Sequence, residues 1–125
     1  MAAEFDCVLV GTAVVDVLIK PVPLTVAVGG GRLLHVDPLG VTTGGLVCNT
    51  GVGMRRLGMR VAAASLVGND LWAATIRESL AREGIDIAGL EARPSIATSS
   101  TAVLIDPSGE RTFAHPVGGC AAIDR

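Results

Sequence analysis

The chain has 125 residues, of which 50% are hydrophobic and 18% charged, and this composition excludes a disordered polar tail. The formal net charge is only -2, without runs of one sign, so the sequence has no electrostatic footprint for nucleic acid or an anionic membrane. No apolar run reaches the length of a membrane span, and the first residues are acidic where a signal peptide is basic. We therefore predict a cytoplasmic protein with neither nucleic-acid nor membrane partners.

The first third of the chain predicts a buried strand followed by a small antiparallel element. Residues 7–10 form a short apolar run, and a second apolar stretch over 14–19 is interrupted only by Asp16. Two prolines end this stretch, and a glycine-rich turn follows. The alternating pattern over 32–37 then predicts a strand with one solvent-facing side.

The remainder of the chain alternates predicted helices and strands. A short helix is expected to open at Asn49 and to end at Gly58. Asp70 suits the N-cap of an amphipathic helix, whose apolar residues recur at helical spacing. This order of elements is typical of an α/β fold. The other predicted elements are a helix over 71–83, strands over 60–67 and 85–90, and a hairpin of 101–105 and 111–114.

The last residues, 121–125, read as the start of a further helix. With three parallel strands and two helices, one face of the sheet would stay uncovered, which open α/β sheets rarely tolerate. We therefore expect the chain to be the N-terminal part of a larger protein, or a fragment of its gene.

The spacing of cysteine and histidine predicts no metal site. Cys7, Cys48 and Cys120 lie far apart without a CxxC pair, so they read as buried small hydrophobic residues rather than as zinc ligands or disulfide partners. His35 and His115 have no paired ligands, so each is expected on the surface or in a lid.

The glycines do not form either common nucleotide-binding loop. The one lysine, Lys20, lies outside any Walker A pattern. Gly51 and Gly53 begin like a dinucleotide fingerprint, but Arg56 stands where its third glycine belongs. The glycine spacing therefore argues against a nicotinamide-binding domain.

A different set of glycines keeps a more specific spacing. Gly44-Gly45 is followed by Asn49, and then by Leu57-Gly58 and Gly68-Asn69-Asp70. This spacing resembles the first signature of the ribokinase (PfkB) family of carbohydrate kinases. Other parts match in order: Gly11 and Asp16 in the first strands, the hairpin residues 109–113, and a turn at 118–120.

The resemblance implies a sugar site built from Asp16, Gly44, Gly45 and Asn49. A carboxylate can accept two hydrogen bonds from neighbouring hydroxyls, an amide can donate and accept, and glycines let backbone N–H groups approach a ligand closely. Simpler roles are open as well. Asp16 could be a strand-edge acid facing water, Asn49 a helix N-cap, and the glycine pair an ordinary turn.

The fold implied by the resemblance is α/β, the N-terminal part of a ribokinase-like three-layer α/β sandwich with a small β-sheet lid. Residues 1–125 would form the substrate-binding portion of a carbohydrate kinase domain, without the C-terminal ATP-binding and catalytic portion. The lid would be a separate small sheet formed by residues 14–42 and 98–115. Its exposed face and edges would allow a homodimer through the lid.

The function implied by the resemblance is ATP-dependent phosphorylation of a sugar or nucleoside hydroxyl. ATP and Mg²⁺ are expected for the full-length protein, whereas this segment alone is expected to bind neither and to be inactive, because the family's Gly-Ala-Gly-Asp motif with the catalytic base is missing. Val14 and Leu46 replace polar residues of ribose-specific members, which leaves fructose, a keto-deoxy sugar acid or a nucleoside open. The alternative is a non-catalytic sugar-binding or oligomerisation module, a truncated pseudo-kinase.

Overall fold

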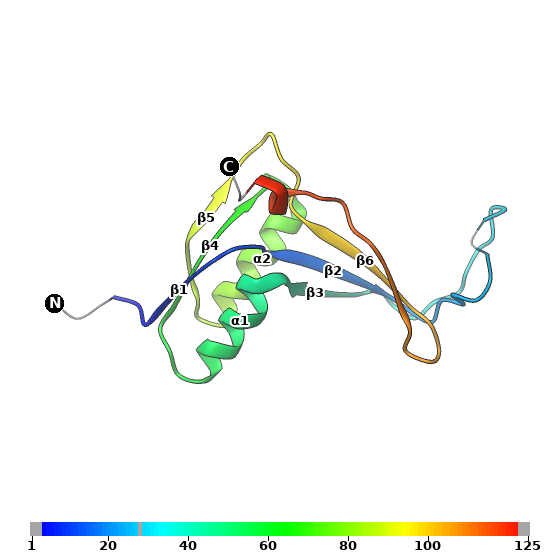
Figure 1. The fold of residues 1–125 in the computed structure, drawn as a ribbon, viewed down its shortest axis with the longest axis horizontal. Helices are drawn as coiled ribbons and strands as arrows, with labels where there is room; N and C mark the ends of the chain where they lie inside the picture. The colour runs from blue at the N-terminus through cyan, green and yellow to red at the C-terminus, as the bar shows by residue number, and fades with distance from the viewer. Residues whose placement is uncertain (1–3, 28, 123–125) are drawn as a thin grey trace.

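The computed structural model describes residues 4–27 and 29–122, which form two β-sheets and two helices (Figure 1). The first sheet is parallel, with strand order β1-β4-β5. The second sheet has the order β3-β2-β6-β7 and extends away from the helices. The strands are β1 (Cys7–Val10), β2 (Val14–Ile19), β3 (Gly40–Gly44), β4 (Val61–Val67), β5 (Asp86–Ala92), β6 (Ser100–Ile105) and β7 (Arg111–Ala114); the helices are α1 (Gly45–Arg56), α2 (Leu71–Arg82) and the 3-10 turn η1 (Gly119–Ala122).

The main core lies between the helices and one face of the parallel sheet. Ile76 and Leu80 of α2 are fully buried, and they follow the three- to four-residue spacing of an amphipathic helix. They belong to one apolar cluster with Val61 and Val67 of β4 and Val47 of α1. Burial of these side chains provides the main driving force for packing the helices on the sheet.

The two α-helices that the structure describes both cover the same face of the parallel sheet, so neither α1 nor α2 covers the opposite face. Val8 and Val10 of β1 are 59% and 65% exposed. Parallel sheets are normally covered on both faces. The mixed α/β class is therefore confirmed, while the described residues supply only one of the two helical layers of a sandwich.

The second sheet contains strands from both predicted lid segments, and none of these strands pairs with the parallel sheet. Strand β2 is an inner strand, antiparallel to β3 and parallel to β6. Strand β7 pairs with β6 as the predicted hairpin. In the predicted lid segment 14–42, the described residues between β2 and Gly40 form no strand, and β3 begins at Gly40.

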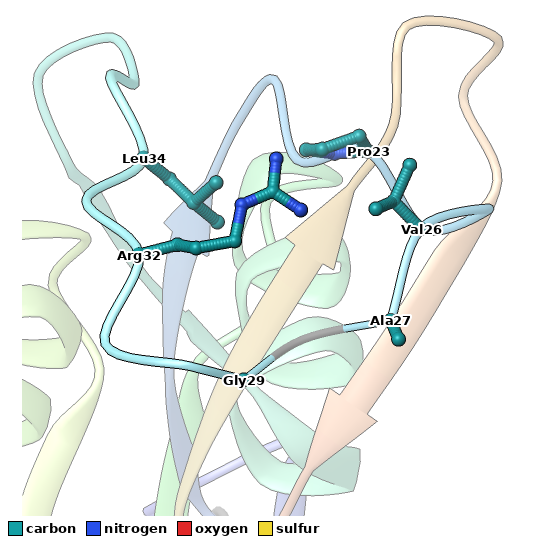
Figure 2. A pocket seen from close by; sticks show the side chains of 6 residues that line it. All are labelled: Pro23, Val26, Ala27, Gly29, Arg32 and Leu34. Atoms are coloured by element: carbon teal, nitrogen blue, oxygen red, sulfur yellow. The ribbon is translucent and has the colours of Figure 1, made fainter.

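The strand predicted over 32–37 is wrong. These residues belong to a loop that follows β2, in which Gly30 and Gly31 adopt positive φ angles. The backbone edge of β2 is instead paired with β3, so the alternating pattern has no partner strand. Figure 2 shows this loop folded on itself around a small pocket lined by Pro23, Val26, Ala27, Gly29, Arg32 and Leu34.

The predicted start of the first helix is also wrong. Helix α1 begins at Gly45, four residues before the predicted start at Asn49, and Gly44 is its N-cap residue. The predicted end is right, since Leu57 is the C-cap and Gly58 follows with a φ of 89°. Of the helix expected over 121–125, the turn η1 includes residues 121 and 122, and the rest lies outside the described residues.

Asp70 is confirmed as the N-cap of α2 and also binds the segment that enters the second sheet. One carboxylate oxygen accepts from the backbone N–H of Ala73 at 2.9 Å, and the other accepts from that of Thr98 at 2.9 Å. The Thr98 hydroxyl in turn accepts from Gly68 N–H at 2.8 Å. Partial burial raises the pKa of Asp70, but the hydrogen bonds outweigh it and leave the pKa below its ordinary value.

Replacing Asp70 by alanine should lower the free energy of unfolding by about 2 kcal/mol, because α2 loses its cap and the Thr98 N–H loses its acceptor. Urea denaturation measures this change. The control is Glu78→Ala on the exposed face of α2, which removes an exposed i,i+4 ion pair with Arg82 and should change stability by less than about 0.5 kcal/mol. Equal effects of the two variants would contradict the role given to Asp70.

Candidate functional site

Asp16 lies against the start of helix α1. A Cβ atom placed on Gly44 would be only 2.5 Å from Asp16 Oδ2, so the absence of a side chain at Gly44 makes room for the carboxylate. The positive end of the helix dipole favours a carboxylate at this position. Asp16 is half-buried on the inner strand β2, and none of the described residues forms a hydrogen bond or ion pair with its carboxylate.

Gly45 is required by both its conformation and its surroundings. Its φ is 81°, which side chains other than glycine rarely adopt, and a Cβ here would lie 2.6 Å from the Thr12 carbonyl oxygen. That carbonyl accepts a hydrogen bond from Val47 N–H at 3.0 Å, and the Thr12 hydroxyl accepts one from Leu46 N–H at 3.4 Å. Thr12 thus satisfies two amides at the start of α1, where no intrahelical partner exists.

Sequence reasoning missed Thr12. The residue type and its place after Gly11 give no signal, because the contact depends on how closely α1 approaches the link between β1 and β2. A Cβ on Gly11 would be 2.9 Å from Leu46 Cδ2, which shows how tight this approach is. The glycines at 11 and 45 are the one available hint that two backbone segments meet here.

Asn49 is not a helix N-cap, since it lies in the second turn of α1. It is exposed and lines a cavity to which Thr42 also contributes, and Thr42 is the register partner of Asp16. Asp16 itself does not line this cavity, so the convergence of Asp16 and Asn49 on one pocket stays a prediction. The other lining residues are Thr43, Cys48, Val52, Arg56, Ser79 and Glu83.

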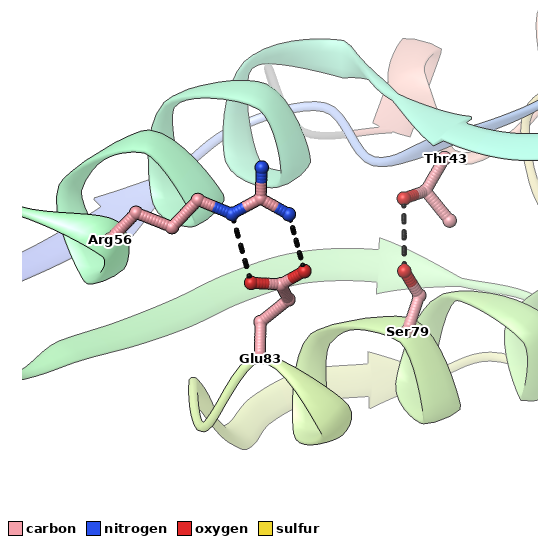
Figure 3. Close-up of polar contacts among 4 residues, drawn as sticks. All are labelled: Thr43, Arg56, Ser79 and Glu83. Atoms are coloured by element: carbon pink, nitrogen blue, oxygen red, sulfur yellow. Dashed lines mark hydrogen bonds and ion pairs between the residues drawn. The ribbon is translucent and has the colours of Figure 1, made fainter.

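Two polar contacts hold the walls of this cavity together, as Figure 3 shows. The Arg56 guanidinium of α1 donates to both carboxylate oxygens of Glu83, at 2.8 and 3.3 Å. The hydroxyl groups of Thr43 on β3 and Ser79 on α2 are 3.2 Å apart and share a hydrogen bond. These contacts link α1 to the C-cap of α2 and β3 to the α2 helix.

Cys48 is the buried neighbour of this site. Its side chain is 1% exposed, and burial raises the pKa of the thiol, with the negative charge of Asp16 acting in the same direction. The thiol therefore stays protonated and packs as a small hydrophobic group, as predicted. Cys7 is only half-buried, and the side chain of Cys120 lies outside the described residues.

Two further features, a metal-ligand cluster and a membrane-spanning helix, are absent from the described residues. Within residues 4–27 and 29–122, no three side chains of the types His, Cys, Asp or Glu gather closely enough to hold a metal ion. Over the same part of the chain, no helix has both the length and the apolar character to cross a membrane.

The close approach of Asp16 to Gly44 gives a specific prediction. Gly44→Ala should destabilise the fold by about 1–3 kcal/mol, because the new methyl group must displace the carboxylate. Gly53→Ala in the middle of α1 is the matched control: a Cβ there meets nothing within 4 Å, and the change should stabilise the helix by about 0.5–1 kcal/mol.

Thermal or urea unfolding of both variants checks this prediction. Combining Gly44→Ala with Asp16→Ala should recover part of the loss, since the clash is between these two residues. Strictly additive effects of the two substitutions would contradict the proposed contact.

Comparisons with known proteins identify relatives of this chain. The profile of the pfkB family carbohydrate kinases matches residues 5–122. A fructokinase from Klebsiella pneumoniae is 34% identical over 109 residues, which cover 87% of this chain and 31% of that protein. An uncharacterized sugar kinase of Escherichia coli is 31% identical over 105 residues, covering 84% of this chain and 31% of its own.

Solved structures show the same fold. The ribokinase of Arabidopsis thaliana, complexed with ribose and ATP, superposes with a TM-score of 0.79 at 17% identity, covering 94% of this chain and 37% of that one. A putative ribokinase II from Escherichia coli gives a TM-score of 0.77 at 24% identity, covering 93% and 36%. The chain thus spans about a third of the length of these relatives. By its sequence match and its fold, it belongs to the pfkB family of carbohydrate kinases.

Proposed function

We propose that this chain supplies the sugar-binding and lid portion of an ATP-dependent carbohydrate kinase. The observation that carries the proposal is the Asp16 carboxylate, which lies at the glycine-built start of α1 without a partner among the described residues. A half-buried carboxylate costs free energy unless it is hydrogen-bonded. Two neighbouring hydroxyl groups of a sugar are suitable donors, because each carboxylate oxygen accepts hydrogen bonds.

The sugar class rests on the relatives and on two residues near the site. The relatives named above include a fructokinase and a ribokinase complexed with ribose and ATP. Val14, two residues before Asp16, is 8% exposed and offers no hydrogen bond to a sugar from its side chain, and Leu46 is likewise apolar. These residues favour fructose over ribose as the first ligand to test, while a keto-deoxy sugar acid or a nucleoside remain further candidates.

The phosphoryl-transfer step depends on groups that this sequence does not contain. The family resemblance places the catalytic base and the anion hole in a Gly-Ala-Gly-Asp motif, which is missing from residues 1–125. Without them the chain can orient a sugar but cannot stabilise the transferred phosphoryl group. ATP and Mg²⁺ therefore belong to the longer protein, for which we propose a cytoplasmic location and pairing through the second sheet.

A second candidate function is a non-catalytic module that binds a sugar or mediates oligomerisation. The missing motif favours this alternative for the chain on its own. One measurement distinguishes the two functions. Residues 1–125 are joined to the C-terminal two-thirds of the Klebsiella fructokinase, and phosphorylation of D-fructose is measured. Activity is expected if residues 1–125 form the sugar-binding portion of a kinase, and no activity if they form a non-catalytic module. The 125-residue chain alone should release no sugar-dependent ADP.

The role of Asp16 is tested by D-fructose binding to the 125-residue chain, followed by NMR titration. Asp16→Ala should weaken binding by about 2–5 kcal/mol, the range for removing one member of a buried charged hydrogen-bonding set. Asp37→Asn, in the exposed loop after β2, is the control and should leave the affinity unchanged. In the joined polypeptide, Asp16→Ala should raise the KM for D-fructose while ATP affinity stays the same. An unaltered D-fructose affinity in Asp16→Ala would show that this acid has no role in sugar binding.

A further inference from the structure

We propose that Thr101 and His115 form a second sugar-binding point on the same sheet face as Asp16, with the His115 imidazole donating a hydrogen bond to a substrate oxygen. The inference rests on the proposed function, because it places these two residues in the same sugar site. It assigns them a role in substrate recognition that is separate from that of Asp16.

The strand register places the relevant side chains in one row. Asp16 of β2 lies directly opposite Thr42 of β3 on one side and Thr101 of β6 on the other. Ala102 of β6 pairs with Ala114 of the antiparallel strand β7, so the next pair outward is Thr101 and His115. Residues directly opposite each other point to the same face of a sheet. Thr42, Asp16, Thr101 and His115 therefore cross one face in order.

The hydrogen bond between Thr101 and His115 determines which ring nitrogen of His115 can bind a ligand. Thr101 Oγ1 and His115 Nδ1 are 3.0 Å apart. Thr101 is only 7% exposed, so its hydroxyl hydrogen needs an acceptor, and Nδ1 is the acceptor within reach. The neutral imidazole then carries its proton on Nε2 and presents it from an exposed side chain.

Two members of this row, Asp16 and His115, are chemically complementary to a sugar. The Asp16 carboxylate only accepts hydrogen bonds, while Nε2–H of His115 donates one. A sugar hydroxyl can do both, so one sugar can donate at Asp16 and accept at His115. Their Cα atoms are two strand spacings apart, about 10 Å, with Thr101 between them on the same face.

The next row on the same face is apolar. Leu18 pairs with Val103, and Val103 pairs with Phe113, whose side chain is 60% exposed. An exposed aromatic ring beside a polar row suits the C–H face of a sugar ring, while the hydroxyls meet the polar residues. The substrate class is therefore a monosaccharide with an acceptor oxygen at the end remote from Asp16. That oxygen belongs to a hydroxyl or to the carboxylate of a sugar acid.

The test compares D-fructose and D-gluconate binding to the 125-residue chain by NMR titration. His115→Ala and Thr101→Val should each lower the affinity for at least one of the two ligands 5-fold or more. His115→Gln, which keeps an N–H donor, should restore most of the affinity, a result that a purely structural role would not give. Thr112→Val is the matched control on the opposite face of β7 and should have no effect. His115→Ala leaves the Thr101 hydroxyl, which is only 7% exposed, without its acceptor, so the free energy of unfolding of each variant is measured in urea and affinities are compared only under conditions in which every variant is folded.

The outcomes separate the two proposals. If His115→Ala loses affinity for D-fructose, the sugar oxygen remote from Asp16 is a hydroxyl. If it loses affinity for D-gluconate alone, that oxygen belongs to a carboxylate. Both outcomes support the inference. If Asp16→Ala abolishes binding while His115→Ala and Thr101→Val keep it, the inference is overturned and the proposed function stands. If the wild-type chain binds neither ligand saturably, both are overturned. An equal loss in Thr112→Val also overturns the inference.

Discussion

The close packing of backbone around the first turn of α1 is the constraint on which the rest of the site depends. Three segments meet there: the link between β1 and β2, the end of β3, and the helix itself. Thr12 accepts from two amides of the helix, and Gly44 and Gly45 leave no room for side chains. Because of this packing, the Asp16 carboxylate lies directly against the start of the helix.

A second junction ties the other half of the second sheet to the helical core. Asp70 and Thr98 connect the start of α2 to the segment that leads into β6. The Gly119 N–H donates to the Ala97 carbonyl at 2.8 Å, so the strand that returns from β7 is fixed at the same place. The second sheet is thus linked by hydrogen bonds to the start of α2 where the chain enters β6, and the chain that leaves β7 returns to the same segment.

Much of the fold could be predicted from the sequence, because strong local signals determine it. The cap at Asp70, the spacing of Ile76 and Leu80, and the turn glycines Gly58 and Gly84 all act within a few residues along the chain. The strand expected over 32–37 failed because alternation shows only that one side is polar and does not show which edge is available for pairing. The helix start failed because Thr12, far away in sequence, supplies the acceptors that extend α1 back to Gly45.

The site could be predicted only in part, because some of its residues are brought together by contacts between distant parts of the sequence. Asp16, Gly44 and Gly45 carry a signal in their residue types, and the structure brings these three together. Thr101 and His115 carry none, since their hydrogen bond follows from the pairing of β6 with β7. Asn49 lines a neighbouring cavity that Asp16 does not line. No local sequence pattern shows whether Asn49 belongs to this cavity or to the site of Asp16.

The uncovered face of the parallel sheet has a practical consequence for work with the isolated chain. Val8 and Val10 lie more than half exposed on β1, which is also an edge strand, since β4 is its one pairing partner among the residues that the structure describes. Exposed apolar surface next to an open strand edge favours self-association, which grows with protein concentration and with salts such as sulfate. Dilute, low-salt buffers are therefore the conditions in which the chain's own sugar affinity is separated from colloidal effects.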